Sequence, residues 1–131
     1  GVTEIANFAK YEVSGPGAEA YLNHILTNRM PKKGRIVLSP MLNEFGKLIG
    51  DFTIANAGPR GGDERFIIWG SSAAQKYHMR WFERHLPKDG SVRLHRFDQT
   101  LVGLSIAGPK SQMLLQKLGA FVMPIKTKIS T

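Results

Sequence analysis

The sequence has 131 residues, no cysteine, and 18 lysines and arginines against 10 acidic residues, a formal net charge of +8. This length fits one domain with its own core, and the absence of cysteine excludes a disulfide framework, a cysteine zinc site and a thiol nucleophile. No apolar run approaches the ~18 residues of a membrane span, so we expect no membrane partner. The charge allows a polyanionic partner without identifying one. A chain without cysteine fits a reducing compartment, and we expect a cytoplasmic location.

The first half of the chain predicts a strand, a helix and a hairpin. Residues 4–14 alternate weakly between apolar and polar, as a strand does, and a Gly-Pro-Gly turn then opens a helix over 17–27. Residues 35–42 and 47–55 read as the two strands of a hairpin, and in the second strand Leu48, Gly50, Phe52 and Ile54 should point to one face and Ile49 to the other. Pro40 donates no ladder hydrogen bond, so it must lie at a sheet edge or a bulge.

The second half predicts three more strands and two helices. Residues 65–69 form a short apolar strand, and Ser71 and Ser72 cap a helix over 72–86. Residues 91–97 alternate as a strand does. The continuous apolar run 101–106 predicts a central strand, and Gly108-Pro109 opens a last helix whose Met113, Leu114 and Leu118 should face the core. This order of elements predicts an α+β fold with a mostly antiparallel sheet and three helices.

The sequence lacks several common catalytic and nucleotide-binding motifs. There is no nucleophile elbow, no P-loop and no H-E-x-x-H, and Gly15-Pro16-Gly17 lacks the third glycine of a dinucleotide fingerprint. His78 and His85 lie seven residues apart without a carboxylate at ligand spacing, so we expect no metal site.

A basic cluster occupies residues 76–96. Lys76, Arg80 and Arg84 follow one another at spacings of four, which makes a stripe on one helix face. Such a stripe suits a nucleic-acid backbone or an acidic protein partner, and it also suits a solvated helix face. Tyr77 and Trp81 have the spacing of core residues, which makes nucleic acid the weaker interpretation.

Asp51 is the residue whose position the pattern does not explain. It lies in the middle of an apolar strand, where burying an unpaired carboxylate costs several kcal/mol. A cross-strand pair with Arg35 or Lys47 would satisfy it. Alternatively, the carboxylate is kept for an N–H group or a cationic nitrogen of a ligand.

The ordered motifs of residues 1–118 resemble those of a known family. They include a Gly-Pro helix opening, Thr27-Asn28 before a loop, the turn N-E-F-G at 43–46, R-W-F-E at 80–83, and L-x-G-L-x-I-A-G-P-K from 101. The chain is similar to the folate-binding aminomethyltransferase fold of the glycine-cleavage T-protein. It resembles more closely the C-terminal folate part of dimethylglycine and sarcosine dehydrogenases.

The resemblance implies a tetrahydrofolate pocket. Asp51 matches the family's carboxylate on the strand after the N-E-x-G turn, near the folate nitrogens that take up a one-carbon unit. There its negative charge would stabilise a developing positive charge or orient the folate amine. The other positions that the resemblance places at the pocket are Phe8, Leu38, Thr53, Trp69 and Ser71. Leu38 and Ser71 replace a tyrosine and an asparagine of the T-protein, which suits the dehydrogenase branch.

The resemblance also implies that parts of the family's enzymes are missing here. Residues 119–131 do not resemble the family's continuation, and we expect them to form an atypical C-terminal tail. FAD would belong to a missing N-terminal portion of the dehydrogenases. We therefore expect a partial folate-binding domain that is not catalytic alone, whose partners are folate, the missing domains of a parent enzyme, or a second copy bound through the uncovered surface. The alternative is a non-catalytic basic module that binds nucleic acid or an acidic protein.

Overall fold

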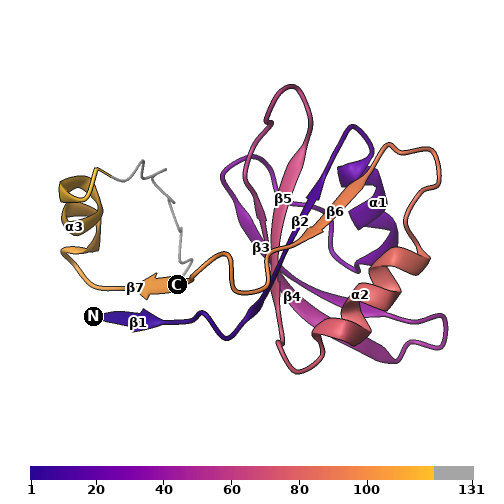
Figure 1. Cartoon of the computed structure of the whole chain (residues 1–131), viewed down its shortest axis with the longest axis horizontal. Coiled ribbons are helices and arrows are strands. Elements are labelled where there is room, and N and C mark those ends of the chain that lie inside the picture. Colours follow the sequence, from indigo (N-terminus) through magenta and orange to yellow (C-terminus); the bar gives the residue numbers. More distant parts are fainter. Residues whose placement is uncertain (120–131) are drawn as a thin grey trace, which may run out of the picture.

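The computed structural model describes residues 1–119, and within them the chain forms a five-stranded sheet, a separate strand pair and three helices (Figure 1). The strands are β1 (Val2–Glu4), β2 (Ala9–Ser14), β3 (Ile36–Leu42), β4 (Leu48–Asn56), β5 (Arg65–Gly70), β6 (Arg93–Arg96) and β7 (Leu104–Ile106). The helices are α1 (Ala18–Ile25), α2 (Gln75–Arg84) and α3 (Ser111–Lys117). All strand pairs are antiparallel, so the predicted α+β class is confirmed.

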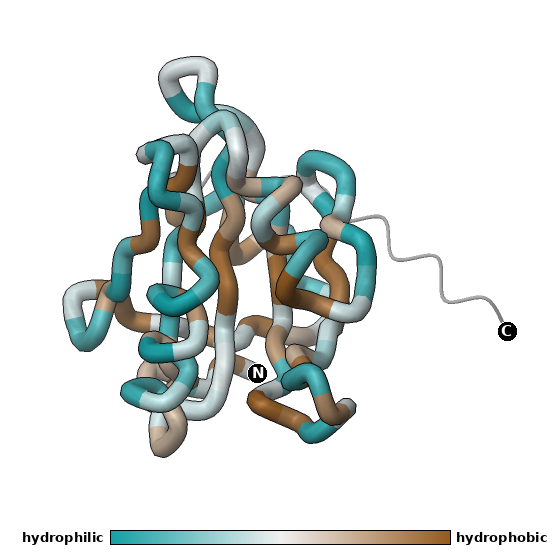
Figure 2. Tube along the Cα trace, turned by 90° about the vertical axis from the view of Figure 1, so that its right-hand side faces the viewer, coloured by the Kyte–Doolittle hydropathy of each residue, from teal (hydrophilic) through white to brown (hydrophobic). Residues whose placement is uncertain are grey.

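The large sheet has the order β3-β4-β5-β2-β6, and α1 and α2 cover one of its faces (Figure 1). Side chains alternate along each strand, so every second residue points to the helices. Apolar segments run along the strands, and hydrophilic residues gather in the connecting loops (Figure 2).

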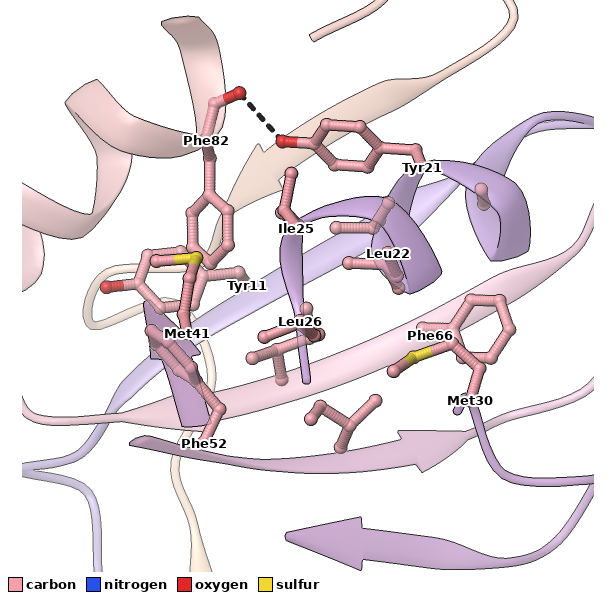
Figure 3. Packing of buried hydrophobic residues seen from close by; sticks show 14 of the residues in the cluster. Tyr11, Tyr21, Leu22, Ile25, Leu26, Met30, Met41, Phe52, Phe66 and Phe82 are labelled. Atoms are coloured by element: carbon pink, nitrogen blue, oxygen red, sulfur yellow. Dashed lines mark hydrogen bonds between the residues drawn. The ribbon is translucent and has the colours of Figure 1, made fainter. Parts of the chain in front are cut away.

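The core lies between this face of the sheet and the two helices (Figure 3). Tyr11 from β2, Phe66 from β5, Leu22 from α1 and Phe82 from α2 are almost completely buried. The hydroxyl of Tyr21 donates a hydrogen bond to the carbonyl of Phe82 at 2.7 Å, which joins α1 to α2 (Figure 3). Burial raises the pKa of the Tyr21 hydroxyl, which therefore stays protonated as a donor.

The β3–β4 hairpin follows the prediction, with one irregularity. Gly50, Phe52 and Ile54 share one face as expected, and this face is the buried one. Pro40 lies on β3, which is an edge strand of the five-stranded sheet. The pairing jumps from Met41–Gly50 to Leu42–Leu48, and this bulge leaves Ile49 without a partner in the ladder. Leu48 is therefore exposed and Ile49 buried, the reverse of the strict alternation that we predicted.

Two predictions for the last third of the described chain are wrong. Residues 101–106 do not form a central strand, because only Leu104–Ile106 is extended and it pairs with β1 in a separate two-stranded sheet. Helix α3 lies beside this pair, away from α1 and α2 (Figure 1), and it buries no residue. Met113, Leu114 and Leu118 are consequently exposed instead of core residues.

The other boundaries differ only locally, but the prediction that Ser71 and Ser72 cap the second helix is wrong, because the N-cap of α2 is Ala74 and no side chain caps it. The strand predicted over residues 4–14 is divided into β1 and β2 by a turn over residues 5–8. The tail predicted over residues 119–131 lies outside the described residues from 120 onward, so its character stays a prediction. No helix within residues 1–119 is long and apolar enough to cross a bilayer.

Candidate functional site

The candidate site lies on the sheet face that α1 and α2 leave open. The strand register sets Leu38, Thr53, Trp69 and Lys10 side by side in one row across β3, β4, β5 and β2. These residues alternate with core residues such as Ile54 and Ile68, so they point away from the helices. The antiparallel pairing therefore brings together residues that lie up to 59 positions apart in the sequence.

This open face carries a cavity of about 760 Å³, within the usual range for a small-molecule site. Its floor is the sheet, and its walls are the turn at residues 5–8 and the Ser71-Ser72 segment after β5. All six residues that the resemblance placed at a ligand pocket line this cavity: Phe8, Leu38, Asp51, Thr53, Trp69 and Ser71. The grouping of these residues, which the sequence leaves scattered, is a result of the fold.

Asp51 is exposed at the cavity and is not buried among apolar residues. Across the ladder it faces Pro40, which has no N–H to offer, while Arg35 lies opposite Asn56. The first of the two interpretations, a cross-strand ion pair with Arg35 or Lys47, is therefore not what the described residues show. Within residues 1–119 the Asp51 carboxylate makes no hydrogen bond or ion pair, so both of its oxygens can accept N–H donors from a ligand.

The rest of the cavity surface is apolar and aromatic. Leu38 is 71% exposed and Phe8 47% exposed, although side chains of these kinds are normally covered. Trp69 offers a flat ring beside the Thr53 hydroxyl in the central row. One carboxylate beside apolar and aromatic surface is suited to a flat heteroaromatic ligand that carries N–H groups or a nitrogen cation.

His78 supports the cavity floor from the core side. It is 2% exposed and lies edge-on against Phe52, with ring centroids 4.8 Å apart. Its Nδ1 lies 3.4 Å from the Tyr11 hydroxyl, and the ring also hydrogen-bonds the Ile49 backbone. Burial lowers the pKa of His78, with smaller opposing effects from the Ile49 hydrogen bond and the Asp51 charge. Burial likewise raises the pKa of Tyr11 to about 12.

Two glycines, Gly50 and Gly70, lie against the His78 and Phe52 rings at positions where a side chain would clash with them. A Cβ built on Gly50 would lie 2.6 Å from His78 Nε2, and one built on Gly70 would lie 2.7 Å from Phe52 Cε1. Both contacts are shorter than atoms tolerate. Gly50 and Gly70 therefore let α2 and its His78 approach the sheet directly behind the cavity.

Several cavity residues escaped the sequence reasoning. They are Ile5, Asn7, Ile36, Ser39, Pro40, Phe52, Gly70 and Ser72. Ile36 lies two residues before Leu38 on the edge strand β3, so both point to the same face, and this period of two could have identified Ile36. Ile5 and Asn7 lie on a turn inside what reads as one strand, so no pattern pointed to them.

The basic cluster is divided by the structure. Arg93 pairs with Asp63, and Arg96 Nε lies 2.7 Å from Asp98 Oδ1, so these two strand residues are neutralised locally. Lys76, Arg80 and Arg84 stay exposed on α2. The prediction that Tyr77 has a core position is wrong, because it is 50% exposed between them. Among residues 1–119, no group of three or more histidines and carboxylates could hold a metal ion.

Comparison with known proteins agrees with this fold. Residues 1–125 match the model of the GCVT N-terminal domain, so the chain belongs to this family. Among curated relatives, it is 29% identical over 118 residues to mitochondrial dimethylglycine dehydrogenase of Homo sapiens, covering 89% of this chain and 13% of that protein. It is 27% identical over 120 residues to an aminomethyltransferase of Chloroherpeton thalassium, covering 90% of this chain and 32% of that protein.

A solved structure has the same fold. The glycine cleavage system aminomethyltransferase T of Bartonella henselae superposes with a TM-score of 0.74 at 19% identity, over 91% of this chain and 32% of that one. The suspected resemblance to aminomethyltransferases and dimethylglycine dehydrogenases is thus confirmed at the level of family and fold. The chain spans a third or less of the length of these relatives.

Proposed function

We propose that the cavity on the open face of the sheet binds tetrahydrofolate. The observation that carries this proposal is that Asp51, Thr53, Trp69, Phe8, Leu38 and Ser71 line one cavity of about 760 Å³. A flat ligand with a hydrogen-bonding heterocycle suits this surface, since Trp69 and the apolar side chains offer contact area. Asp51 offers the charged acceptor.

In this proposal Asp51 acts electrostatically. Its carboxylate accepts hydrogen bonds from ligand N–H groups, and its charge stabilises positive charge that develops on a neighbouring nitrogen. In the intact parent enzyme, tetrahydrofolate would take up a one-carbon unit from an N-methyl or aminomethyl donor. The chain corresponds to 13% of the human dehydrogenase and 32% of the bacterial aminomethyltransferase, so the donor chemistry and any FAD would belong to other parts of such an enzyme.

The test is isothermal titration of the chain with tetrahydrofolate. Replacing Asp51 by Asn keeps the shape and removes the charge, and we expect the dissociation constant to rise about tenfold, the loss of roughly 1.4 kcal/mol from one charge-assisted hydrogen bond. Glu83→Gln is the matched control, since Glu83 is exposed on α2 and does not line the cavity. Wild type that binds no better than Asp51→Ala would contradict the site.

A second candidate function has its own observation. The exposed stripe of Lys76, Arg80 and Arg84 flanks an exposed aromatic ring, Tyr77, which suits a polyanion such as nucleic acid or an acidic protein. Binding of this kind weakens steeply as salt rises from about 50 to 200 mM, whereas binding in the apolar cavity changes little. A titration of single-stranded oligonucleotide at several salt concentrations distinguishes the two functions.

The cytoplasmic location stays a prediction. The human dehydrogenase that the chain resembles is named as a mitochondrial protein. Fractionation of the source cells would decide between the two compartments.

A further inference from the structure

Lys10 is a buried cation beside the candidate site. It stands on β2 in the same row as Trp69, on the face away from the helices, yet only 1% of its surface is exposed. Its Nζ donates to the carbonyl of Ala6 at 2.8 Å and to that of Phe8 at 2.9 Å. The ammonium group is therefore held under the turn at residues 5–8.

This arrangement is costly for a structural residue. Taking an ammonium group out of water carries a desolvation penalty, and an apolar side chain of similar volume would avoid it. Within residues 1–119 no carboxylate lies within 4.0 Å of Lys10 Nζ to offset the burial. The two turn carbonyls are its partners, so what the charge stabilises is the conformation of this turn.

The turn at residues 5–8 is one wall of the cavity, because Ile5, Asn7 and Phe8 line it. On its outer side, the Ile5 amide donates to the Gly103 carbonyl at 2.8 Å. Inside the turn, the Phe8 amide donates to the Ile5 carbonyl at 3.3 Å. This distance is longer than that of a usual N–H···O hydrogen bond, so the bond is weak. Two charge-assisted contacts therefore restrain the turn: the Ala6 amide donates to the Glu4 carboxylate, and Lys10 holds the Ala6 and Phe8 carbonyls. The Lys10 bond is the one that reaches the end of the turn that carries Phe8.

We propose that Lys10 is a positioning residue of the cavity. Its ammonium group holds the Ala6 and Phe8 carbonyls so that the Phe8 side chain stays against the ligand space. The part of the proposal in which this wall contacts tetrahydrofolate rests on the proposed function. The part in which Lys10 restrains the turn is independent of any ligand.

The first experiment needs no ligand. In a Trp81→Phe background, Trp69 is the single tryptophan, and it lines the same cavity as Phe8. We expect Lys10→Met to raise the acrylamide quenching constant of Trp69 about twofold, because a turn with fewer bonds opens more often. Lys88→Met, the same substitution on an exposed loop lysine, should leave quenching unchanged. Unchanged quenching in Lys10→Met overturns the proposal.

A double-mutant cycle separates positioning from a direct effect on Trp69. If Lys10 acts through Phe8, then Lys10→Met adds little to the quenching already raised by Phe8→Ala. If Lys10→Met has the same effect in both backgrounds, Lys10 acts on Trp69 directly across the β2–β5 pair, and the proposal is overturned. Should Lys10→Met fail to fold by circular dichroism, Lys10→Gln, which keeps N–H donors but removes the charge, takes its place. Quenching of Trp69 equal to that of the wild-type chain would then overturn the proposal that the ammonium group restrains the turn.

The second experiment repeats the same cycle with tetrahydrofolate affinity. We expect Lys10→Met to raise the dissociation constant about tenfold, and to raise it little further once Phe8 is Ala. If the wild-type chain does not bind tetrahydrofolate, the proposed function fails while the quenching cycle still decides the role of Lys10. If wild type binds and Lys10→Met binds equally well, the positioning role fails alone.

Discussion

His78 shows how one side chain can connect the core to the candidate site. It packs against Phe52 from the core side and lies close enough to the Tyr11 hydroxyl for a hydrogen bond, at 3.4 Å. Phe52 is itself part of the cavity lining. Any change in the charge of His78 is therefore felt directly beneath the cavity floor.

This position predicts a loss of stability in mild acid. The folded state lowers the pKa of His78 below its ordinary 6.5, mainly by burial, so the unfolded chain binds the proton more readily. The contribution of His78 to the free energy of unfolding should therefore be greatest above pH 6.5. It should fall as the pH drops below that value, by up to about 1.4 kcal/mol per pH unit for one proton. Urea unfolding between pH 7.5 and 5 measures this slope.

The control for the acid effect is His78→Gln, which cannot titrate. We expect this variant to be less stable than wild type at pH 7.5, because it loses ring packing on Phe52. It should also show a flatter pH dependence between 6.5 and 5. An equal slope in the two proteins would mean that other groups cause the acid loss.

At the scale of elements, the exposed edge of the sheet is covered by the segment that follows α1. The Thr27 amide donates to the Pro40 carbonyl at 3.0 Å, and Asn28 Nδ2 donates to the Leu38 carbonyl at 2.6 Å. The Asn28 amide also donates to the Ser39 hydroxyl. These bonds occupy acceptors on β3 that a foreign strand would otherwise use, which protects the edge from aggregation.

We therefore expect Asn28→Ala to weaken the fold and expose the edge. Removing the amide leaves the Leu38 carbonyl without this donor, at a cost of about 1 kcal/mol in the free energy of unfolding. Aggregation on warming should increase in parallel. Thermal unfolding followed by light scattering tests both effects, with Gln112→Ala on exposed α3 as the matched control. Equal scattering from the two variants would mean that Asn28 does not guard the edge.

At the scale of the whole molecule, residues 1–119 divide into two parts that differ in burial. The five-stranded sheet with α1 and α2 has a core, whereas β1, β7 and α3 contain no fully buried residue. Val2, Leu104, Met113 and Leu118 are each more than half exposed there. A two-stranded ribbon is marginally stable without an apolar partner, so this part has the character of a surface that another domain or a second copy would cover.

Hydrogen exchange should reveal this difference. We expect the amides of β1 and β7 to exchange through local opening at a free energy well below that of global unfolding, while β2, β4 and β5 exchange only on global unfolding. Exchange followed by mass spectrometry on the 131-residue chain measures both. Protection of β1 equal to that of β2 would contradict it. Light scattering of the same sample tests the predicted homodimer, in which a second copy covers the exposed side chains.

The sequence by itself determined the local elements and the class of fold. The hairpin, the helices, the edge position of Pro40 and the inward faces of Phe52 and Ile54 follow from periodicity and turn residues, which act over a few neighbouring positions. The same local rules misplaced residues 101–106. An apolar run has the same pattern in a central strand as in an exposed strand of a two-stranded sheet, so the residues of the run alone do not distinguish the two.

Only the tertiary structure decided the site. Register brings Leu38, Thr53 and Trp69 into one row, and a bulge reverses the faces of Leu48 and Ile49. Long-range packing leaves Asp51 exposed at a cavity and buries Lys10 beneath a turn. The burial of a side chain and its hydrogen-bond partners depend on which distant segments come into contact. That is a property of the whole fold, and a short stretch of sequence does not contain it.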